Sequence, residues 1–328
     1  MNSEEKIESS QSDEGWETYW QGTAEAGAFN AGGVSHPAFK AFWNGFFQSL
    51  NASNSTLAML DIASGNGAVL ECAQLVFQEK STRITCVDLS PSAVSNIQTR
   101  FPDIRGLVCD ARSIPLEDGS FQLVTSQFGV EYAGHDAIIE AARLLGPGGH
   151  LALLMHIRGG AIDQECSSSL QAIRALQDSQ FVPLAAAMFR HGFEAVKGAD
   201  RQPYENAALE LAPAITRVEQ ILSDHGIHVA GDSIGRLYND VGTIHKRLPN
   251  YDASEVTSWL ARMDGEMSAY AERMASMTDS ALDEEEFKSI CNTLKDGGLK
   301  LSEVGPFRVP DIKAPLAWAI LAIRQDED

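Results

Sequence analysis

The stretch "MLDIASGNGAVLE", residues 59–71, constrains the fold more than any other part of the chain. An apolar run ends in the acid Asp61, Gly65 and Gly67 follow, and an apolar helical pattern begins directly after them. Glycines let a ligand approach the backbone closely, and the start of a helix offers free N–H groups. The stretch therefore predicts a strand, a ligand-binding loop and a helix.

Short apolar runs alternate with helical patterns from residue 57 onward. The runs that we expect to be strands are 57–63, 83–90, 104–111, 121–129 and 150–157, and two further strand-like runs, 299–312 and 314–324, follow near the end. Strands that alternate with helices and are apolar on both faces are typical of a parallel sheet. The pattern predicts an α/β domain.

Residues 160–296 interrupt this alternation, because they contain several helical stripes and no convincing strand. We expect them to form a helical insertion between the fifth strand and the last two. Ligands bind at the carboxyl ends of strands in open α/β sheets, so the insertion is expected to be a substrate cap.

An aromatic stripe marks the N-terminal region, residues 16–52. Its members recur at helical spacing and are Phe39, Phe42, Trp43, Phe46 and Phe47. Such a stripe is typical of a helix anchored in the core, and it also suits a lid over a ligand. Residues 1–15 are acidic and polar, without the apolar run of a leader, and predict a disordered tail.

The chain carries 45 acidic and 25 basic residues, a formal net charge of −20. A surface with this much negative charge repels phosphate backbones and anionic lipid. We therefore expect neither a nucleic-acid nor a membrane partner. The five cysteines show no CxxC pairing, and no apolar run approaches the roughly 20 residues that span a bilayer. We expect a cytoplasmic protein, monomeric or homodimeric.

A second acid narrows the choice of ligand. Asp88 ends the second predicted strand about 20 residues after Gly67, where a carboxylate accepts hydrogen bonds from ribose hydroxyls. The dinucleotide pattern G-x-G-x-x-G is broken, since Leu70 stands at its third glycine. Asp61 would also repel a pyrophosphate and suits a cation.

Four segments in register, "LDIASGNGA", "VDLSPSAV", "CDARSIPLEDGSFQLVTSQFG" and "EAARLLGPGGHLALL", resemble class I S-adenosylmethionine-dependent methyltransferases. The resemblance covers residues 57–157 and is nearest to the small-molecule group that includes the ubiquinone-biosynthesis-type enzymes. It implies a Rossmann-like, doubly wound sheet of seven mostly parallel strands with an antiparallel last strand. That domain would comprise residues 53–159 and 297–328, with the helical insertion between strands five and six.

The resemblance also implies which residues bind S-adenosylmethionine. The loop after the first strand would bind the methionine moiety, and the end of the second strand would bind the ribose and the adenine. The end of the third strand would bind the adenine amino group. The end of the fourth strand would face the methionine end and the substrate. In chain order these residues are Asp61, Ala63, Gly65, Gly67, Asp88, Leu89, Asp110, Ala111, Gln127 and Phe128. Ala63 stands where the family has its first loop glycine.

Methyl transfer from a sulfonium needs alignment and exclusion of water, and a hydroxyl or ammonium acceptor also needs a general base. The candidate bases near the expected cleft are Glu131, Tyr132, His135 and His156. Each is also typical of a hydrogen-bonded scaffold residue. The histidines at 225, 228 and 245 show no ligand spacing, so no metal is expected.

The segment "TSQFGVEY" lacks the D/N-P-P-Y/F signature of methyltransferases that act on the amino groups of bases and glutamine. The sequence therefore predicts an enzyme that methylates a small molecule, a metabolite or natural product. A non-catalytic cofactor-binding sensor or scaffold of the same fold is the alternative.

Overall fold

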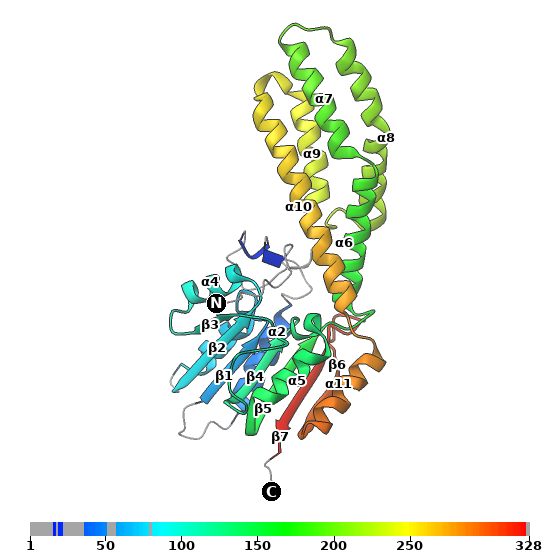
Figure 1. The fold of residues 1–328 in the computed structure, drawn as a ribbon. Coiled ribbons are helices and arrows are strands. Elements are labelled where there is room, and N and C mark those ends of the chain that lie inside the picture. Colours follow the sequence, from blue (N-terminus) through cyan, green and yellow to red (C-terminus); the bar gives the residue numbers. More distant parts are fainter. Residues whose placement is uncertain (1–15, 18, 22–35, 51–56, 79–80, 326–328) are drawn as a thin grey trace, which may run out of the picture. The chain divides into compact units, whose positions relative to one another are not determined.

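Seven strands form one sheet in the order β3-β2-β1-β4-β5-β7-β6 (Figure 1). The strands are β1 (Leu57–Ile62), β2 (Thr82–Asp88), β3 (Arg105–Val108), β4 (Phe121–Gln127), β5 (Leu145–Met155), β6 (Leu299–Phe307) and β7 (Ala317–Arg324). The first five pair in parallel, and β7 runs antiparallel to both β5 and β6. This confirms the predicted Rossmann-like, doubly wound sheet with an antiparallel last strand.

The structure is a computed structural model that describes residues 16–17, 19–21, 36–50, 57–78 and 81–325. The expected tail, residues 1–15, and part of the N-terminal segment 16–52 lie outside these ranges. The chain divides into two compact units. We call Met1–Glu165 with Ser276–Asp328 the sheet unit, and Cys166–Ala275 the helical unit.

The helices of the sheet unit follow the apolar spacing of the sequence. They are α2 (Pro37–Ser49), α3 (Ala68–Val76), α4 (Pro91–Arg100), the 3₁₀ turn η1 (Val130–Ala133), α5 (His135–Leu144) and α11 (Glu284–Asp296). The α4 helix begins after Ser90, because the Ser90 hydroxyl accepts the Ala93 N–H and Pro91 occupies the first turn. In α2 the aromatic stripe is mostly buried, and its Phe47 ring contacts Phe77 after α3.

The predicted insertion, residues 160–296, divides between the two units. Its last helix, α11, packs into the core of the sheet unit with α5 (Figure 1), through Phe287, Ile290 and Leu294. These residues recur at three- and four-residue spacing, so one apolar face is buried against the sheet domain. The fifth strand also differs from the expected run 150–157, since β5 begins earlier, at Leu145.

The helical unit is built from long amphipathic helices that lie alongside one another (Figure 1). They are α6 (Ala161–Asp178), α7 (Phe181–Val196), α8 (Gln202–His225), α9 (Ser233–Lys246), the 3₁₀ turn η2 (Leu248–Asn250) and α10 (Ala253–Ser280). The first and last of these extend into the sheet unit at one end. The stripe Ile234, Leu237, Val241 and Ile244 of α9 is buried as its spacing predicts.

Across the described ranges, none of the helices combines the length and the apolar character needed to cross a bilayer.

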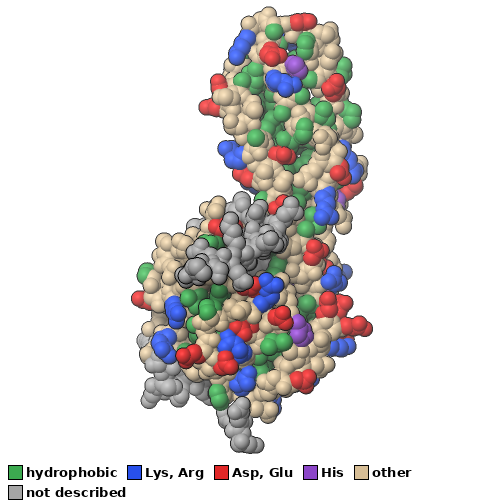
Figure 2. Space-filling model, viewed as in Figure 1, with side chains coloured by type: hydrophobic (Ala, Val, Ile, Leu, Met, Phe, Trp, Pro, Cys, Tyr) green, Lys and Arg blue, Asp and Glu red, His purple; other side chains and the backbone are tan. Residues whose placement is uncertain are grey.

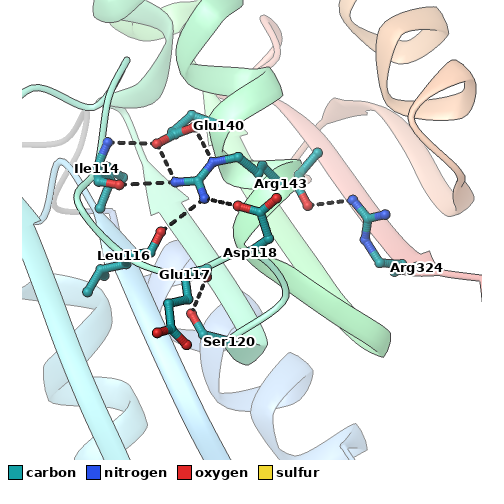
Figure 3. Close-up of polar contacts among 9 residues, drawn as sticks. Ile114, Leu116, Glu117, Asp118, Ser120, Glu140, Arg143 and Arg324 are labelled. Atoms are coloured by element: carbon teal, nitrogen blue, oxygen red, sulfur yellow. Dashed lines mark hydrogen bonds and ion pairs between the residues drawn. The ribbon is translucent and has the colours of Figure 1, made fainter.

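Arg143 of α5 holds the loop between β3 and β4 in place (Figure 3). Its guanidinium donates to the carbonyls of Ile114 and Leu116 at 3.0 and 2.9 Å, and pairs with Asp118. Glu140 binds the same guanidinium at 2.7 Å and accepts the Ile114 N–H at 2.6 Å. The pairing with Glu140 raises the pKa of Arg143, so the clamp stays charged.

We expect Arg143→Ala to lower the free energy of unfolding by about 2 kcal/mol, because two carbonyls and two carboxylates lose their donor. Urea denaturation of the full chain measures this. Arg190→Ala, on the exposed face of α7, is the control and should change it by less than about 0.5 kcal/mol. Equal stability of the two variants would contradict the role of the clamp.

Candidate functional site

The loop after β1 turns sharply through left-handed backbone. Ala63, Gly65 and Gly67 have φ of 52°, 51° and 82°. The Gly65 N–H donates to the Asp88 carboxylate at 2.8 Å, which ties this loop to the end of β2. A side chain at Gly129 would clash with the Ala63 Cβ at 2.4 Å, so the loop also packs against the end of β4.

Asp61 is a buried acid beneath this loop, 1% exposed. The Thr125 hydroxyl donates to its Oδ1 at 2.7 Å. Burial raises the pKa of Asp61 to about 7, opposed by the hydroxyls of Thr125 and Ser64. No Lys, Arg or His among the described residues pairs with it. A buried carboxylate without a cation fits an ammonium ligand.

Asp88 lies half-buried at the end of β2. Its Oδ1 accepts the Ser90 N–H at 2.9 Å. Burial raises its pKa, opposed by the N–H donors of Ser90 and Gly65, and the Glu17 carboxylate raises it further. Beside it Leu89 is 38% exposed, and Val108 at the end of β3 is 52% exposed. An acid next to uncovered apolar side chains suits a ribose and a base.

Asp110 is paired with Arg112, a residue to which no sequence pattern pointed. The Arg112 guanidinium donates from Nε to Oδ1 at 3.0 Å and from Nη2 to Oδ2 at 2.5 Å. This hydrogen bonding lowers the pKa of Asp110. The neighbouring Ala111 is half-buried. An adenine amino group at Asp110 would therefore share the carboxylate with Arg112.

Gln127 and Phe128 end β4 beside the N-terminal helix α2. The Trp43 indole N–H donates to the Gln127 amide oxygen at 2.6 Å. The side-chain NH₂ group of Gln127 is therefore the part of the amide that could donate to a ligand. Phe128 has φ of 54°, a strained value for a bulky residue, and its ring lies 5.1 Å from that of Phe39.

The structure brings three of the four candidate bases together. His156 Nδ1 lies 2.7 Å from Glu131 Oε1, and the Tyr132 ring lies edge-on to the imidazole at 5.7 Å. The fourth, His135, is exposed and bonds to the Thr293 hydroxyl of α11. His135 is therefore not part of this cluster, because it begins α5 and faces a neighbouring helix.

A short helical turn near the N-terminus also reaches the site, and sequence reasoning missed it. The Trp20 indole packs on Gly65, where an added Cβ would lie 2.8 Å from it. Glu17 accepts hydrogen bonds from the hydroxyls of Ser90 and Ser92. The Trp16 ring lies edge-on to Tyr132 at 5.9 Å. The four-residue spacing of two tryptophans was the available signal.

The histidines considered as a metal pair are engaged otherwise, since His225 bonds Ser168, His228 bonds Asp232 and His245 bonds Tyr204. In the parts of the chain that the structure describes, no three His, Cys, Asp or Glu side chains gather as metal ligands would. Figure 2 shows acidic and basic side chains interspersed on the visible face of each unit.

Part of this chain is similar to known proteins. A family model described as a methyltransferase domain matches residues 60–153. An uncharacterised methyltransferase of Schizosaccharomyces pombe is 29% identical over 147 residues, 44% of this chain and 57% of that protein. A demethylmenaquinone methyltransferase of Chlamydia trachomatis is 31% identical over 116 residues, 34% and 49% of the two chains. The chain thus spans about half the length of these relatives.

Solved structures give weaker likenesses. Geranyl diphosphate C-methyltransferase from Streptomyces coelicolor A3(2) has a TM-score of 0.37 and 17% identity, over 46% of this chain and 66% of that one. An S-adenosyl-L-methionine-dependent methyltransferase structure from Methanococcus maripaludis has a TM-score of 0.40 and 12% identity, over 89% and 87%. Scores this low carry no conclusion about this chain.

The sheet order and the loop after β1 define a Rossmann-like methyltransferase fold. Together with the family match, they show that the chain carries a class I S-adenosylmethionine-dependent methyltransferase domain.

We expect Asp61→Asn to gain stability over wild type as the pH rises. The folded pKa of Asp61 is raised from 3.8 to about 7, so between these values the native state holds a proton that the unfolded state has lost. Raising the pH therefore destabilises the wild type, whereas the variant has no carboxyl group at this position and does not lose stability in this way. Chemical denaturation of both at several pH values measures it.

Asp103→Asn, in the exposed turn before β3, controls for loss of an acid. A stability difference between wild type and Asp61→Asn that stays constant from about pH 4 to 7 would refute the buried-acid assignment.

Proposed function

We propose that this protein transfers a methyl group from S-adenosylmethionine to a small-molecule acceptor. The observation that carries the proposal is the buried carboxylate of Asp61 beneath the loop that ends at Gly67, which no basic side chain of the described residues neutralises. A cationic amino acid end of a nucleoside matches it in charge. The family match over residues 60–153 supports the same reaction.

Each part of the cofactor has a proposed partner in this chain. Asp61 and the Ala63–Gly67 loop would bind the methionine end, and Asp88 the ribose. The exposed Leu89 would contact the adenine, and Asp110 with Ala111 would bind its amino group. When bound, the cofactor supplies an activated methyl group. The protein supplies alignment, a dry site and the handling of the acceptor proton.

The net charge of the chain supports a small acceptor. The cysteines support a location in a reducing compartment. A net charge of −20 opposes binding to nucleic acid. None of the five cysteines, all of which lie in the described ranges, forms a disulfide, which supports a reducing compartment such as the cytoplasm. A sensor or scaffold would need the acid and glycine residues to bind a cofactor, but it would not need a buried His–Glu pair. Because the chain has both features, we favour the enzyme.

We further propose that the helical unit serves the acceptor and not the cofactor. The chain leaves the sheet unit shortly after β5 and returns before β6, and β5 ends at the edge that holds Asp61 and Gln127. The proposed cofactor contacts all come from residues 61–128. Because ligands bind at the carboxyl ends of strands in open α/β sheets, a chain that departs from this edge is the basis of the proposal.

We expect micromolar binding of S-adenosylmethionine and S-adenosylhomocysteine to wild type, falling at least about tenfold in Asp88→Ala, or about 1.4 kcal/mol. The loss follows because the ribose hydroxyls lose their acceptor. Calorimetry measures it, with NAD as a competing ligand and Asp103→Ala as the matched control. Absence of binding by wild type, or tighter binding of NAD, would sink the proposed function.

We expect replacement of residues 166–275 by a short linker to abolish turnover while keeping cofactor affinity within about tenfold. The sheet unit retains every proposed cofactor contact, whereas the acceptor would lose its partner. The measurements are methyl transfer and calorimetry on the same preparation. Loss of cofactor binding in a folded deletion variant would show instead that the helical unit supports the cofactor site.

A further inference from the structure

A buried imidazole and a buried carboxylate meet where β4 and β5 end. His156 directly follows β5, and Glu131 lies in η1, just after β4. They are 1% and 6% exposed. Glu131 Oε1 lies 2.7 Å from His156 Nδ1 and also accepts the backbone N–H of His156 at 2.8 Å. One oxygen thus fixes both the ring and the backbone of the histidine.

This contact determines which ring nitrogen carries the proton. Glu131 Oε1 already accepts the backbone N–H of His156, so it accepts from the ring as well: Nδ1 is the donor, and in this tautomer Nε2 keeps its lone pair. Nε2 is buried and has no hydrogen-bond partner among the described residues. Buried acceptors are rarely left unpaired, because each one costs free energy. The free nitrogen therefore points to a use in binding or catalysis.

The surroundings hold this pair rigidly. The Ser126 hydroxyl accepts the Val130 N–H at 3.2 Å and so fixes the start of η1. The Leu282 N–H donates to the His156 carbonyl at 3.0 Å. The strained backbone of Phe128 sets its ring 4.5 Å from the imidazole. A pre-set, dry base of this kind is what proton abstraction requires.

We propose that His156 is the general base of the methyl transfer, that Glu131 is its positioning residue, and that the acceptor is a flat molecule with an acidic hydroxyl, of the phenol or enol type. The inference rests on the proposed function. The acceptor O–H bond breaks as its proton moves to Nε2. The oxygen lone pair forms a bond to the methyl carbon, and the sulfur–carbon bond breaks with its electrons remaining on sulfur. The imidazolium, balanced by Glu131, then releases the proton to water.

The hydroxyl follows from the chemistry of the pair. A neutral amine already offers its lone pair, whereas a hydroxyl becomes a strong nucleophile only when its proton leaves during attack. A flat acceptor follows from the packing, since Phe128 and Tyr132 cover the imidazole with ring centroids at 4.5 and 5.7 Å. A planar ring passes between such aromatic side chains and stacks on them.

The first test needs no cofactor. Long-range ¹H–¹⁵N spectra of the labelled full chain at neutral pH report the tautomer of each histidine, and His156→Asn assigns the signals of His156. We expect the proton on Nδ1 and an unprotonated Nε2. A proton on Nε2 would overturn the proposal whatever the protein binds.

The second test uses variants with ¹³C-methyl-labelled S-adenosylmethionine and fractionated metabolite extract. We expect kcat to fall at least about 100-fold in His156→Asn and at least about tenfold in Glu131→Gln, with KM and cofactor affinity within about threefold. Glu131→Gln keeps an acceptor oxygen and removes only the charge. His150→Asn, on the same strand, should match wild type. Thermal unfolding of every variant separates lost catalysis from lost folding.

The ¹³C shift of the transferred methyl distinguishes oxygen, nitrogen and carbon products. An O-methyl product supports the inference. An N-methyl or C-methyl product, or unchanged kcat in folded His156→Asn, overturns it while leaving the proposed function standing. Cofactor binding without any transfer overturns both the base and the enzyme in favour of the sensor alternative. Absence of cofactor binding overturns the proposed function itself.

Discussion

The parallel pairing of β1 with β2 on one side and with β4 on the other is the constraint on which the site depends. Parallel strands end at the same edge, so Asp61, Asp88 and Gln127 converge although 66 positions separate the first from the last. The register pairs Asp61 with Thr125, and this brings the Thr125 hydroxyl within hydrogen-bond distance of the Asp61 carboxylate. The glycine loop closes the edge because Asp88 holds the Gly65 N–H.

Buried polar groups at this edge have a cost in the free protein. The carboxylate of Asp61 has its pKa raised to about 7 by burial, and Nε2 of His156 is buried without a hydrogen-bond partner in the described part of the chain. Water would satisfy both groups more cheaply. Such groups are retained where a ligand supplies the missing partner. The protein is then less stable without the ligand, but it binds a ligand that carries the complementary group in preference to others. An ammonium and an acidic hydroxyl are the complementary partners.

The two ends of the inserted segment are hydrogen-bonded to each other next to β5, the strand that His156 follows. Ile157 and Leu282 form a parallel bridge, and the Trp318 indole N–H donates to the Leu282 carbonyl at 2.9 Å. The outgoing and returning chain are therefore joined beside His156, within the sheet unit. Such an anchor lets the inserted helices vary in length and sequence without disturbing the sheet. It also explains why α11 belongs to the core, since the chain has already returned there.

The strands and the acid-and-glycine loop were predictable from the sequence, because strand and helix periods and turn residues such as Gly65 and Gly67 act locally. The sequence could not separate His135 from His156, since both stand near strand ends. The contact of Glu131 with His156, the pairing of Arg112 with Asp110 and the place of α11 in the sheet unit became visible only in the fold. Such pairing depends on which elements pack together and on the direction of each side chain, and neither leaves a periodic pattern in the chain.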